Sequence, residues 1–369
     1  MSSTSDAQLL AQWLAVESPS HEAAAVNAMV EVVALYAAHP GIGIERLAGR
    51  DGLGDLLILR AGPDNGRRSA LVIGHLDTVH PLGVVQDALP IRQEGDRLYG
   101  PGVYDMKGGV LIALQAMLAA AQAGRLQRPV VFALSPDEEI GSPTSRPVIE
   151  TLAREADFAL VMEPAREGGG CVTARKAVGR YKISFEGRAA HAGMRHQDGR
   201  SAILEAARQI VEIEALTDYA AGVTASVGVI SGGTGVNVVP QFSCIEVDLR
   251  APSDLLACGC DRRLYGLRAF DPDVSVKVEG GLNRPAYERN PGSIALYERA
   301  RGLAEGLGMA LPEAPMTGGG SDGNFTAALG VPTLDGLGIE GAGAHTLSEY
   351  GLTASIAPRR ALIGALLEG

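Results

Sequence analysis

The spacing of hydrophobic and polar residues predicts two kinds of structure in this chain, and the first occupies its opening third. Between residues 6 and 38 the hydrophobic residues recur every three or four positions, which predicts two amphipathic helices. Short hydrophobic runs at 55–60, 69–74 and 129–135 are typical of buried strands, and an alanine-rich helical run at 107–124 separates the last two. Strands that alternate with helices predict a mainly parallel α/β sheet covered by helices.

The pattern changes after a glycine-rich stretch at 163–176. The elements then follow the order strand, helix, strand, strand, helix, strand, which predicts a small α+β domain of the ferredoxin-like type. Their ranges are 181–186, 201–216, 225–230, 244–250, 255–267 and 274–279. The α/β pattern resumes with helices at 291–307 and 356–367. We therefore assign residues 1–176 and 286–369 to the larger domain and residues 177–285 to an inserted domain.

Composition excludes several classes of partner. The formal net charge is -11 and the pI is about 5.2, so the protein repels a phosphate backbone and an anionic membrane surface. We expect neither a nucleic acid nor a membrane partner. The four cysteines form no CxxC pair or disulfide framework, and the first residues lack the pattern of a secretory signal. These features predict a cytoplasmic protein.

The first candidate for chemistry is the run LVIGHLDTVHP, which places His75 and Asp77 at the end of a hydrophobic strand. Residues two apart on a strand project from the same face. His75 could bind zinc through one ring nitrogen while Asp77 accepts a hydrogen bond from the other. A hydrogen-bonded core histidine explains the pair equally well, so the pair alone does not decide between the two. We place the neighbouring His80 outside the site.

Carboxylates follow at two further points. Asp105 lies in a glycine-rich turn before the long helix, where a helix cap is the alternative explanation. Glu138 and Glu139 end another strand, and adjacent carboxylates repel each other unless a cation or a shared proton separates them. Because neighbouring side chains diverge, one glutamate could bind a metal while the other acts as general base. A solvated acidic turn is the alternative here.

Five residues form a candidate metal site when they are taken together. They are two imidazoles and three carboxylates at strand ends or glycine turns, where ligands gather in open α/β sheets: His75, Asp105, Glu139, Glu163 and His345. Nitrogen and oxygen ligands that can share a carboxylate predict two zinc ions roughly 3.5–4 Å apart. Cobalt, manganese or a single ion would suit the same ligand types.

The order of the motifs resembles the dizinc metallopeptidase superfamily that contains glutamate carboxypeptidase, aminoacylase, acetylornithine deacetylase and succinyl-diaminopimelate desuccinylase. The resemblance covers essentially the whole chain and rests on SPSHE, GHLDTV, GPGVYDMKGG, DEEIGS, EPA, GRAAHAG, GVNVVP, VDLRA, GGGSDGN and AHTLSEYG. The segments RPAY, MTGGGSDGNF and SIAPRRALIGALL are most similar to the glutamate carboxypeptidase branch. The resemblance implies a mainly parallel-sheet catalytic domain, an inserted ferredoxin-like dimerisation domain and a homodimer.

The resemblance also implies roles for the five candidate ligands. Asp105 would bridge the two zinc ions, with His75 and Glu163 completing one site. Glu139 and His345 would complete the other site. In this family the peptide bond after the bridging aspartate is typically cis, so we expect a cis bond between residues 105 and 106.

Three further residues acquire catalytic roles from the same resemblance. Glu138 would be the general base that takes a proton from water and delivers it to the leaving amine. Asp77 would orient His75. His191, in GRAAHAG, would reach into the partner subunit's site and stabilise the oxyanion. A structural histidine is the alternative reading of His191 from the residues alone.

Substrate binding is implied at positions that hold a free carboxylate in the family. Arginine suits that task because its planar fork can pair with both oxygens. The matching positions here are Asn237, Arg250, Arg284, Gly318, Gly319 and Gly320. Glutamate-specific relatives carry a lysine a few residues after the metal-binding glutamate, whereas this chain has Gly170 and Cys171 near that offset. We therefore do not expect a preference for a glutamate side chain.

The expected activity is zinc-dependent hydrolysis of an amide bond, with release of a C-terminal or N-acylated amino acid. The substrate would be an N-acyl amino acid or a short peptide. One alternative is a deacylase of a biosynthetic intermediate such as N-acetylornithine or N-succinyl-diaminopimelate. A second is a non-catalytic peptide-binding homologue, against which the presence of all five ligands and Glu138 argues.

Overall fold

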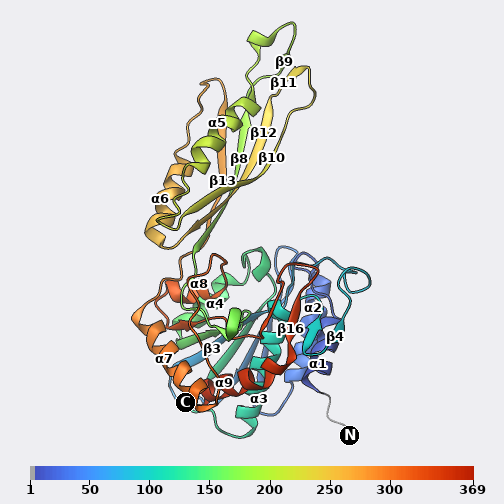
Figure 1. Cartoon of the computed structure of the whole chain (residues 1–369), viewed down its shortest axis with the longest axis vertical. Helices are drawn as coiled ribbons and strands as arrows, with labels where there is room; N and C mark the ends of the chain where they lie inside the picture. The colour runs from blue at the N-terminus through green and yellow to red at the C-terminus, as the bar shows by residue number, and fades with distance from the viewer. Residues whose placement is uncertain (1–4) are drawn as a thin grey trace. The chain divides into compact units, whose positions relative to one another are not determined.

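The computed structural model describes residues 5–369, which fold as two compact units (Figure 1). The first unit runs to Ala174 and resumes at Arg289–Pro315 and Ser321–Gly369. The second unit comprises Arg175–Glu288 and Met316–Gly320. The glycine-rich segment 316–320 thus packs with the inserted unit, although it lies outside the range 177–285 that the sequence pattern assigns to that unit.

The first unit is built on a six-stranded sheet in the order β1-β2-β6-β3-β7-β14. Strands β6, β3, β7 and β14 run parallel, while β2 pairs antiparallel with β6 and β1 pairs antiparallel with β2. The predicted mainly parallel α/β sheet is therefore confirmed. The strands are β1 (Gly43–Leu47), β2 (Leu56–Ala61), β3 (Ser69–His75), β6 (Val130–Ser135), β7 (Ala156–Val161) and β14 (Thr333–Leu334).

Helices cover both faces of this sheet, and the central strand β3 shows the result, since all of its residues are buried. Ala70 and Val72 pack into one core cluster, and Leu71 and Ile73 pack into another. The first cluster includes residues of α1 (Asp6–Leu14), α2 (Ala23–Ala37), α3 (Gly108–Gln122), α7 (Pro291–Gly306) and α9 (Ile356–Glu368). The second includes residues of α4 (Arg146–Arg154) and α8 (Gly323–Ala328).

Helix α3 is the central helix of the first cluster. The window Val103–Gln122 is long and apolar enough to cross a membrane, but 83% of it is buried within the folded chain, as expected for a core helix. Gly109 in its first turn allows a close approach to the sheet, because a Cβ there would lie 2.1 Å from the carbonyl oxygen of Met162. This contact brings the start of α3 to the end of β7.

A second, small antiparallel sheet completes the first unit, in the order β15-β16-β5-β4. Its strands were not predicted from the sequence, because each is only two or three residues long. They are β4 (Arg92–Glu94), β5 (Arg97–Tyr99), β15 (Gly341–Ala342) and β16 (Tyr350–Leu352). Short helical turns occur in the chain at Val103–Lys107, Glu138–Ile140, Glu167–Gly169, His196–Asp198 and Thr353–Ser355.

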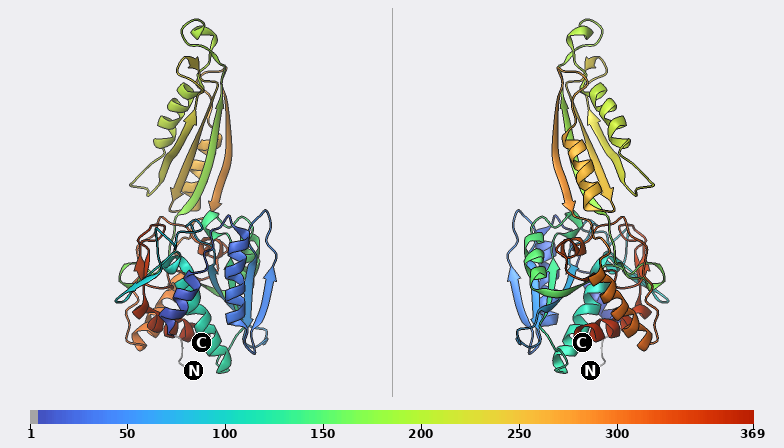
Figure 2. Two further views of the ribbon diagram at one scale, coloured as in Figure 1. Left: turned by 90° about the vertical axis from the view of Figure 1, so that its right-hand side faces the viewer. Right: turned by 90° about the vertical axis from the view of Figure 1, so that its left-hand side faces the viewer.

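The second unit has the predicted ferredoxin-like order of elements, around an antiparallel sheet in the order β10-β12-β8-β13. Its elements are β8 (Ala177–Glu186), α5 (Ala202–Glu214), β10 (Thr224–Gly232), β12 (Phe242–Ala251), α6 (Asp254–Tyr265) and β13 (Ser275–Arg284). Figure 2 shows both helices on one face of the sheet. Accordingly Tyr181, Ile183 and Phe185 of β8 are buried, while the alternating residues Arg180 and Lys182 are exposed on the opposite face.

Candidate metal centre

Three neighbouring parallel strands deliver the candidate ligands to one edge of the catalytic sheet. His75 is the last residue of β3, Glu138 and Glu139 lie in the turn after β6, and Glu163 lies two residues after β7. Because the carboxyl ends of parallel strands meet at one edge, side chains distant in sequence become neighbours there. This property of the sheet allows residues from three separate strands to contribute to one site.

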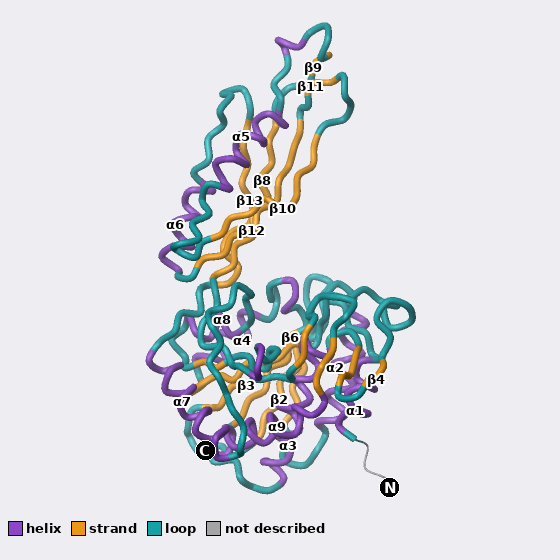
Figure 3. The backbone as a smooth tube through the Cα atoms, in the orientation of Figure 1, coloured by secondary structure: helices purple, strands orange, loops and turns teal. Residues whose placement is uncertain are grey.

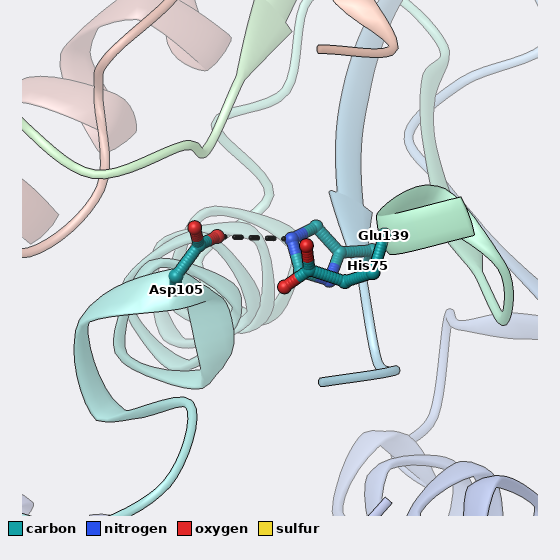
Figure 4. Close-up of side chains that lie close together, drawn as sticks. All are labelled: His75, Asp105 and Glu139. Carbon is teal, nitrogen blue, oxygen red and sulfur yellow. Dashed lines mark hydrogen bonds and ion pairs between the residues drawn. The ribbon is translucent and has the colours of Figure 1, made fainter. Parts of the chain in front are cut away.

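Asp105 lies between two imidazoles. Its Oδ1 is 3.1 Å from Nε2 of His75, and its Oδ2 is 3.4 Å from Nε2 of His345. Figure 4 shows Asp105 facing His75 from the turn that precedes α3, with Glu139 beside them. The peptide bond between Asp105 and Met106 is cis, as the resemblance predicted. A carboxylate whose two oxygens face different imidazoles has the arrangement needed to bridge two ions.

The remaining candidate ligands divide between the two imidazoles. Oε1 of Glu163 is 3.9 Å from Nε2 of His75, and Oε2 of Glu139 is 3.2 Å from Nε2 of His345. His345 adopts a backbone φ of 62°, which is uncommon for a residue with a side chain and is often found at functional sites. The grouping corresponds to the two half-sites that the resemblance implies, although the role of each residue stays a prediction.

The donor set fits divalent metal ions. Potential ligand atoms of His75, Glu138 and Glu163 lie within 4.8 Å of one another, as do those of His75, Asp105 and Glu139. Oε1 of Glu139 is buried and has no hydrogen-bond partner among residues 5–369. A buried carboxylate oxygen normally has a partner, and a bound cation would supply one. The five residues therefore match a site for two ions in both chemistry and geometry.

Asp77 orients both His75 and the glutamate turn. Nδ1 of His75 lies 2.9 Å from the carbonyl oxygen of Asp77 and 3.4 Å from its carboxylate, so the backbone carbonyl is the nearer partner. With Nδ1 acting as donor, Nε2 presents its lone pair to the site. The Asp77 carboxylate accepts the backbone N–H groups of Glu138 and Glu139, both at 3.1 Å, and the Ser20 hydroxyl at 2.7 Å.

The pKa values in the cluster reflect burial and close contact. Burial works to lower the pKa of His75, but its hydrogen bonds to Asp105 and Asp77 raise it well above the usual value. Hydrogen bonds to Asp105 and Glu139 raise the pKa of His345 to about 10. Burial, followed by the charge of Asp105, raises the pKa of Glu139. The cluster therefore holds protons that a bound metal would displace.

Two buried aspartates that the sequence analysis did not select support the turn of the two glutamates. Asp137 accepts the backbone N–H and the hydroxyl of Thr144, both at 2.7 Å. Asp322 accepts the hydroxyl of Ser135 at 2.9 Å and also that of Ser142. Asp322 lies within the motif GGGSDGN, which is the one sequence signal that could have identified it.

Most predicted substrate-binding residues gather at one end of the sheet in the second unit. Arg250 and Arg284 both pair with Val178 of β8, from the two strands that flank it. Gly320 packs against the same place, because a Cβ on it would lie 2.6 Å from Cδ of Arg284. The structure thus brings together the two arginines and the glycine loop.

Arg250 is held in a fixed orientation at this end. Its Nε and Nη2 donate to the two carboxylate oxygens of Asp248 at 2.7 and 2.8 Å, and its Nη1 donates to the carbonyl oxygen of Gly318 at 3.1 Å. Each nitrogen of its guanidinium group therefore already donates a hydrogen bond within the protein. Arg284, on the strand at the other side of β8, is buried.

His191 and Asn237 lie at the opposite end of the same unit, where β9 (Ala190–His191) pairs with β11 (Val238–Val239). Figure 3 shows these two strands beyond the ends of β8 and β12. The carbonyl oxygen of Asn237 accepts the N–H of Ala192 at 2.9 Å. Eight residue steps of about 3.3 Å separate Val178 from Glu186 along β8, so the two ends lie roughly 26 Å apart.

Several known proteins are similar to this chain in sequence or in fold. Carboxypeptidase G2 of a Pseudomonas species is 29% identical over 308 residues, covering 82% of this chain and 74% of that protein. Acetylornithine deacetylase of Myxococcus xanthus is 33% identical over 207 residues, which is 53% of each chain. A dinuclear metal-binding M20 peptidase of Bacillus subtilis shares the fold, with a TM-score of 0.64 and 14% identity over 98% of this chain and 96% of that one.

The model of peptidase family M20/M25/M40 matches residues 71–369, which is most of the chain and includes all five candidate ligands and Glu138. The similar fold and the clustered histidines and carboxylates agree with that match. The chain is therefore a member of the peptidase family M20/M25/M40, and it is a metal-dependent hydrolase of the metallopeptidase and amidohydrolase type.

Proposed function

We propose that this protein is a two-zinc carboxypeptidase or N-acyl amino acid amidohydrolase, which hydrolyses the amide bond next to an amino acid with a free carboxylate. The observation that carries the proposal is the position of Asp105 between His75 and His345, with the Glu138 carboxylate close to His75. Carboxypeptidase G2 is among its relatives, which supports cleavage at the carboxyl end of a substrate.

The chemistry divides between the metal ions and the protein. When bound, two zinc ions would polarise the scissile carbonyl and lower the pKa of water. Glu138 would accept a proton from the attacking water and donate it to the leaving amine. Asp77 would keep Glu138 in place, since its carboxylate accepts the backbone N–H of that residue at 3.1 Å. Cobalt or manganese could occupy the same ligands.

Recognition of the free carboxylate is proposed for the arginine end of the second unit. Arg284 would pair with the substrate carboxylate, while Asp248 and Gly318 keep Arg250 oriented nearby. Near the offset where glutamate-specific relatives carry a lysine, this chain has Gly170 and Cys171, and Cys171 is completely buried. No cation from that position would meet an acidic side chain, so we propose a preference for neutral amino acids.

A second candidate is a deacylase of a biosynthetic intermediate, and the similarity to an acetylornithine deacetylase favours it. Both reactions need the same metal ligands and the same base, and they differ only in the group bound on either side of the amide. The clustering of the candidate ligands with Glu138 argues against the third alternative, a non-catalytic homologue.

The test is release of amino acids from a panel of N-acetyl, N-succinyl and N-aroyl amino acids and dipeptides. Each substrate is measured before chelation, after chelation and after zinc is added back. Chelator-sensitive release that zinc restores is the expected result, with neutral N-acyl amino acids or dipeptides above N-aroyl glutamate. Best turnover of N-acetylornithine or N-succinyl-diaminopimelate would favour the deacylase. No turnover by the zinc-loaded protein would contradict the proposal.

We also propose a homodimer in which His191 serves the site of the partner subunit. His191 and Asn237 lie at the end of their unit opposite the arginines, and the two ends of β8 alone are roughly 26 Å apart, too far for one small substrate to touch both. Strand β10 is an edge strand with exposed Val229 and Ile230, and the adjacent α5 exposes Val211. An exposed hydrophobic edge of this kind favours pairing with a second copy.

Mixing two inactive variants tests the shared site. His191→Ala and Glu138→Ala are each expected to be almost inactive, but a mixed dimer would contain one site with both residues intact. Random reassociation of equal amounts would restore about a quarter of the original activity, because half the dimers are mixed and each has one working site. No recovery in mixtures that demonstrably contain mixed dimers would show that His191 does not act across subunits.

A further inference from the structure

Glu349 is a buried carboxylate immediately before β16 that the sequence analysis did not select, and only 1% of its surface is exposed. Its Oε1 accepts the backbone N–H groups of Tyr104 at 2.9 Å and Asp105 at 3.0 Å. Its Oε2 accepts the N–H of Gly102 at 3.0 Å and lies 3.1 Å from Nε2 of His80. Both oxygens are thus fully engaged, and three of the four contacts go to the turn that carries Asp105.

The surroundings of Glu349 compensate its burial. A buried carboxylate is costly unless hydrogen bonds and nearby positive charge offset the loss of hydration. Three amides and His80 provide the hydrogen bonds. The Lys107 amine is also buried nearby, where it donates to the carbonyl oxygen of Val16 at 2.7 Å. Burial lowers the pKa of Lys107 to about 8, and the Glu349 charge partly offsets that shift.

Glu349 also belongs to the segment that carries His345, only four residues away. The backbone N–H of Glu349 donates to the carbonyl oxygen of Thr346 at 3.4 Å, next to the ligand. One side chain therefore connects the turn of Asp105 to the loop of His345. These two ligands approach each other at 3.4 Å, from positions 240 residues apart in the sequence.

We propose that Glu349 is a positioning residue, which fixes the turn of Asp105 against the loop of His345 and thereby sets the affinity for the metal ion that these two residues share. The proposal rests on the metal site proposed above. His80 assists by fixing one oxygen of Glu349. Partners that orient ligands in this way typically change metal affinity by about 10- to 100-fold when they are removed.

The experiment compares Glu349→Gln with Glu205→Gln as a matched control. Glu205 is equally buried and its carboxylate also accepts backbone N–H groups, those of Phe270 at 3.0 Å and Asp271 at 3.2 Å, but it lies in the second unit. An amide in place of either carboxylate turns one acceptor oxygen into a donor facing other donors. Both variants should therefore lose similar structural stability.

Zinc affinity is measured by competition with a chromogenic chelator, and the cobalt-loaded proteins are compared by their visible absorption spectra. We expect Glu349→Gln to bind one of two ions about 10- to 100-fold more weakly and to show an altered cobalt spectrum. Glu205→Gln should match the unsubstituted protein in both measurements. Affinity and spectrum unchanged in a folded Glu349→Gln would overturn the proposal, as would equal changes in the control.

His80→Gln provides a milder variant if Glu349→Gln does not fold. It replaces the ring nitrogen that contacts Glu349 with a flexible amide, which weakens one of the four contacts and leaves the three backbone N–H contacts in place. We expect a smaller loss of affinity for the same ion, and no change at all would count against the proposal. Failure of the unsubstituted protein to bind two ions would instead contradict the proposed function, so the two failures are distinguishable.

Discussion

The two units of this protein bury their sheets differently. In the first unit every residue of β3 is buried, because helices cover both faces. In the second unit β8 alternates between buried and exposed residues, because α5 and α6 cover one face only. When helices cover both faces of a sheet, ligands can bind at the ends of its strands, and the candidate metal ligands lie there. A sheet covered on one side leaves an edge and a face for other contacts.

The largest expected effect tests the division of labour at those strand ends. Glu138→Ala should keep both metal ions yet lose about 10²–10⁴-fold in kcat, because only the proton-transfer group is removed. Glu139→Ala should lose metal, because it removes a predicted ligand. Metal analysis and initial rates measure the two variants, with the exposed Glu155→Ala as control. Equal metal loss in both would contradict the assignment of base and ligand.

A smaller effect tests the difference in burial itself. Leu71→Ala in β3 and Ile183→Ala in β8 each remove a side chain with no exposed surface, so each should destabilise its unit by about 2–5 kcal/mol. Lys182→Ala, on the exposed face of β8, should change the free energy of unfolding by less than about 0.5 kcal/mol. Denaturant unfolding measures all three. A large effect of Lys182→Ala would show that another surface covers this face in solution.

The smallest expected effect concerns two thiols, one in each unit. Cys171 of the first unit is buried and Cys258 of the second is exposed. Burial raises the pKa of Cys171 to about 12, so almost none of it is thiolate at pH 8. Alkylation of the native protein at pH 8, followed by mass spectrometry, should label Cys258 and leave Cys171 free. Equal labelling of both would contradict the buried environment of Cys171.

The raised pKa of Cys171 also predicts that the free energy of unfolding depends on pH. The unfolded chain releases the Cys171 proton near pH 9, whereas the folded chain holds it until about pH 12. The free energy of unfolding should therefore fall as the pH rises from about 9 to about 12, and Cys171→Ala should lack this contribution. The difference between the two proteins across that range, measured by denaturant unfolding, isolates the effect.

Local sequence patterns predicted much of this structure, since hydrophobic spacing depends on residues close in the chain. The main strands, the long helices and the ferredoxin-like order are examples. The candidate ligands could be grouped because each lies in a recognisable motif at a strand end or glycine turn. The contacts of Glu349 could not be predicted, since its partners Tyr104 and Asp105 are about 245 residues away. Asp322, which supports the glutamate turn, was missed for the same reason.

The segment 316–320 has a practical consequence for dissecting the molecule. The N–H of Lys176 donates to the carbonyl oxygen of Thr317 at 3.0 Å, and Nη1 of Arg175 donates to that of Gly319 at 3.1 Å. A fragment comprising 175–288 alone would lack these acceptors and the one that Gly318 offers to Arg250. To transfer this unit into a relative, both 175–288 and 316–320 would have to be exchanged. A chimera that exchanges only 175–288 would lack the glycine segment that packs at the end of the sheet carrying the two arginines.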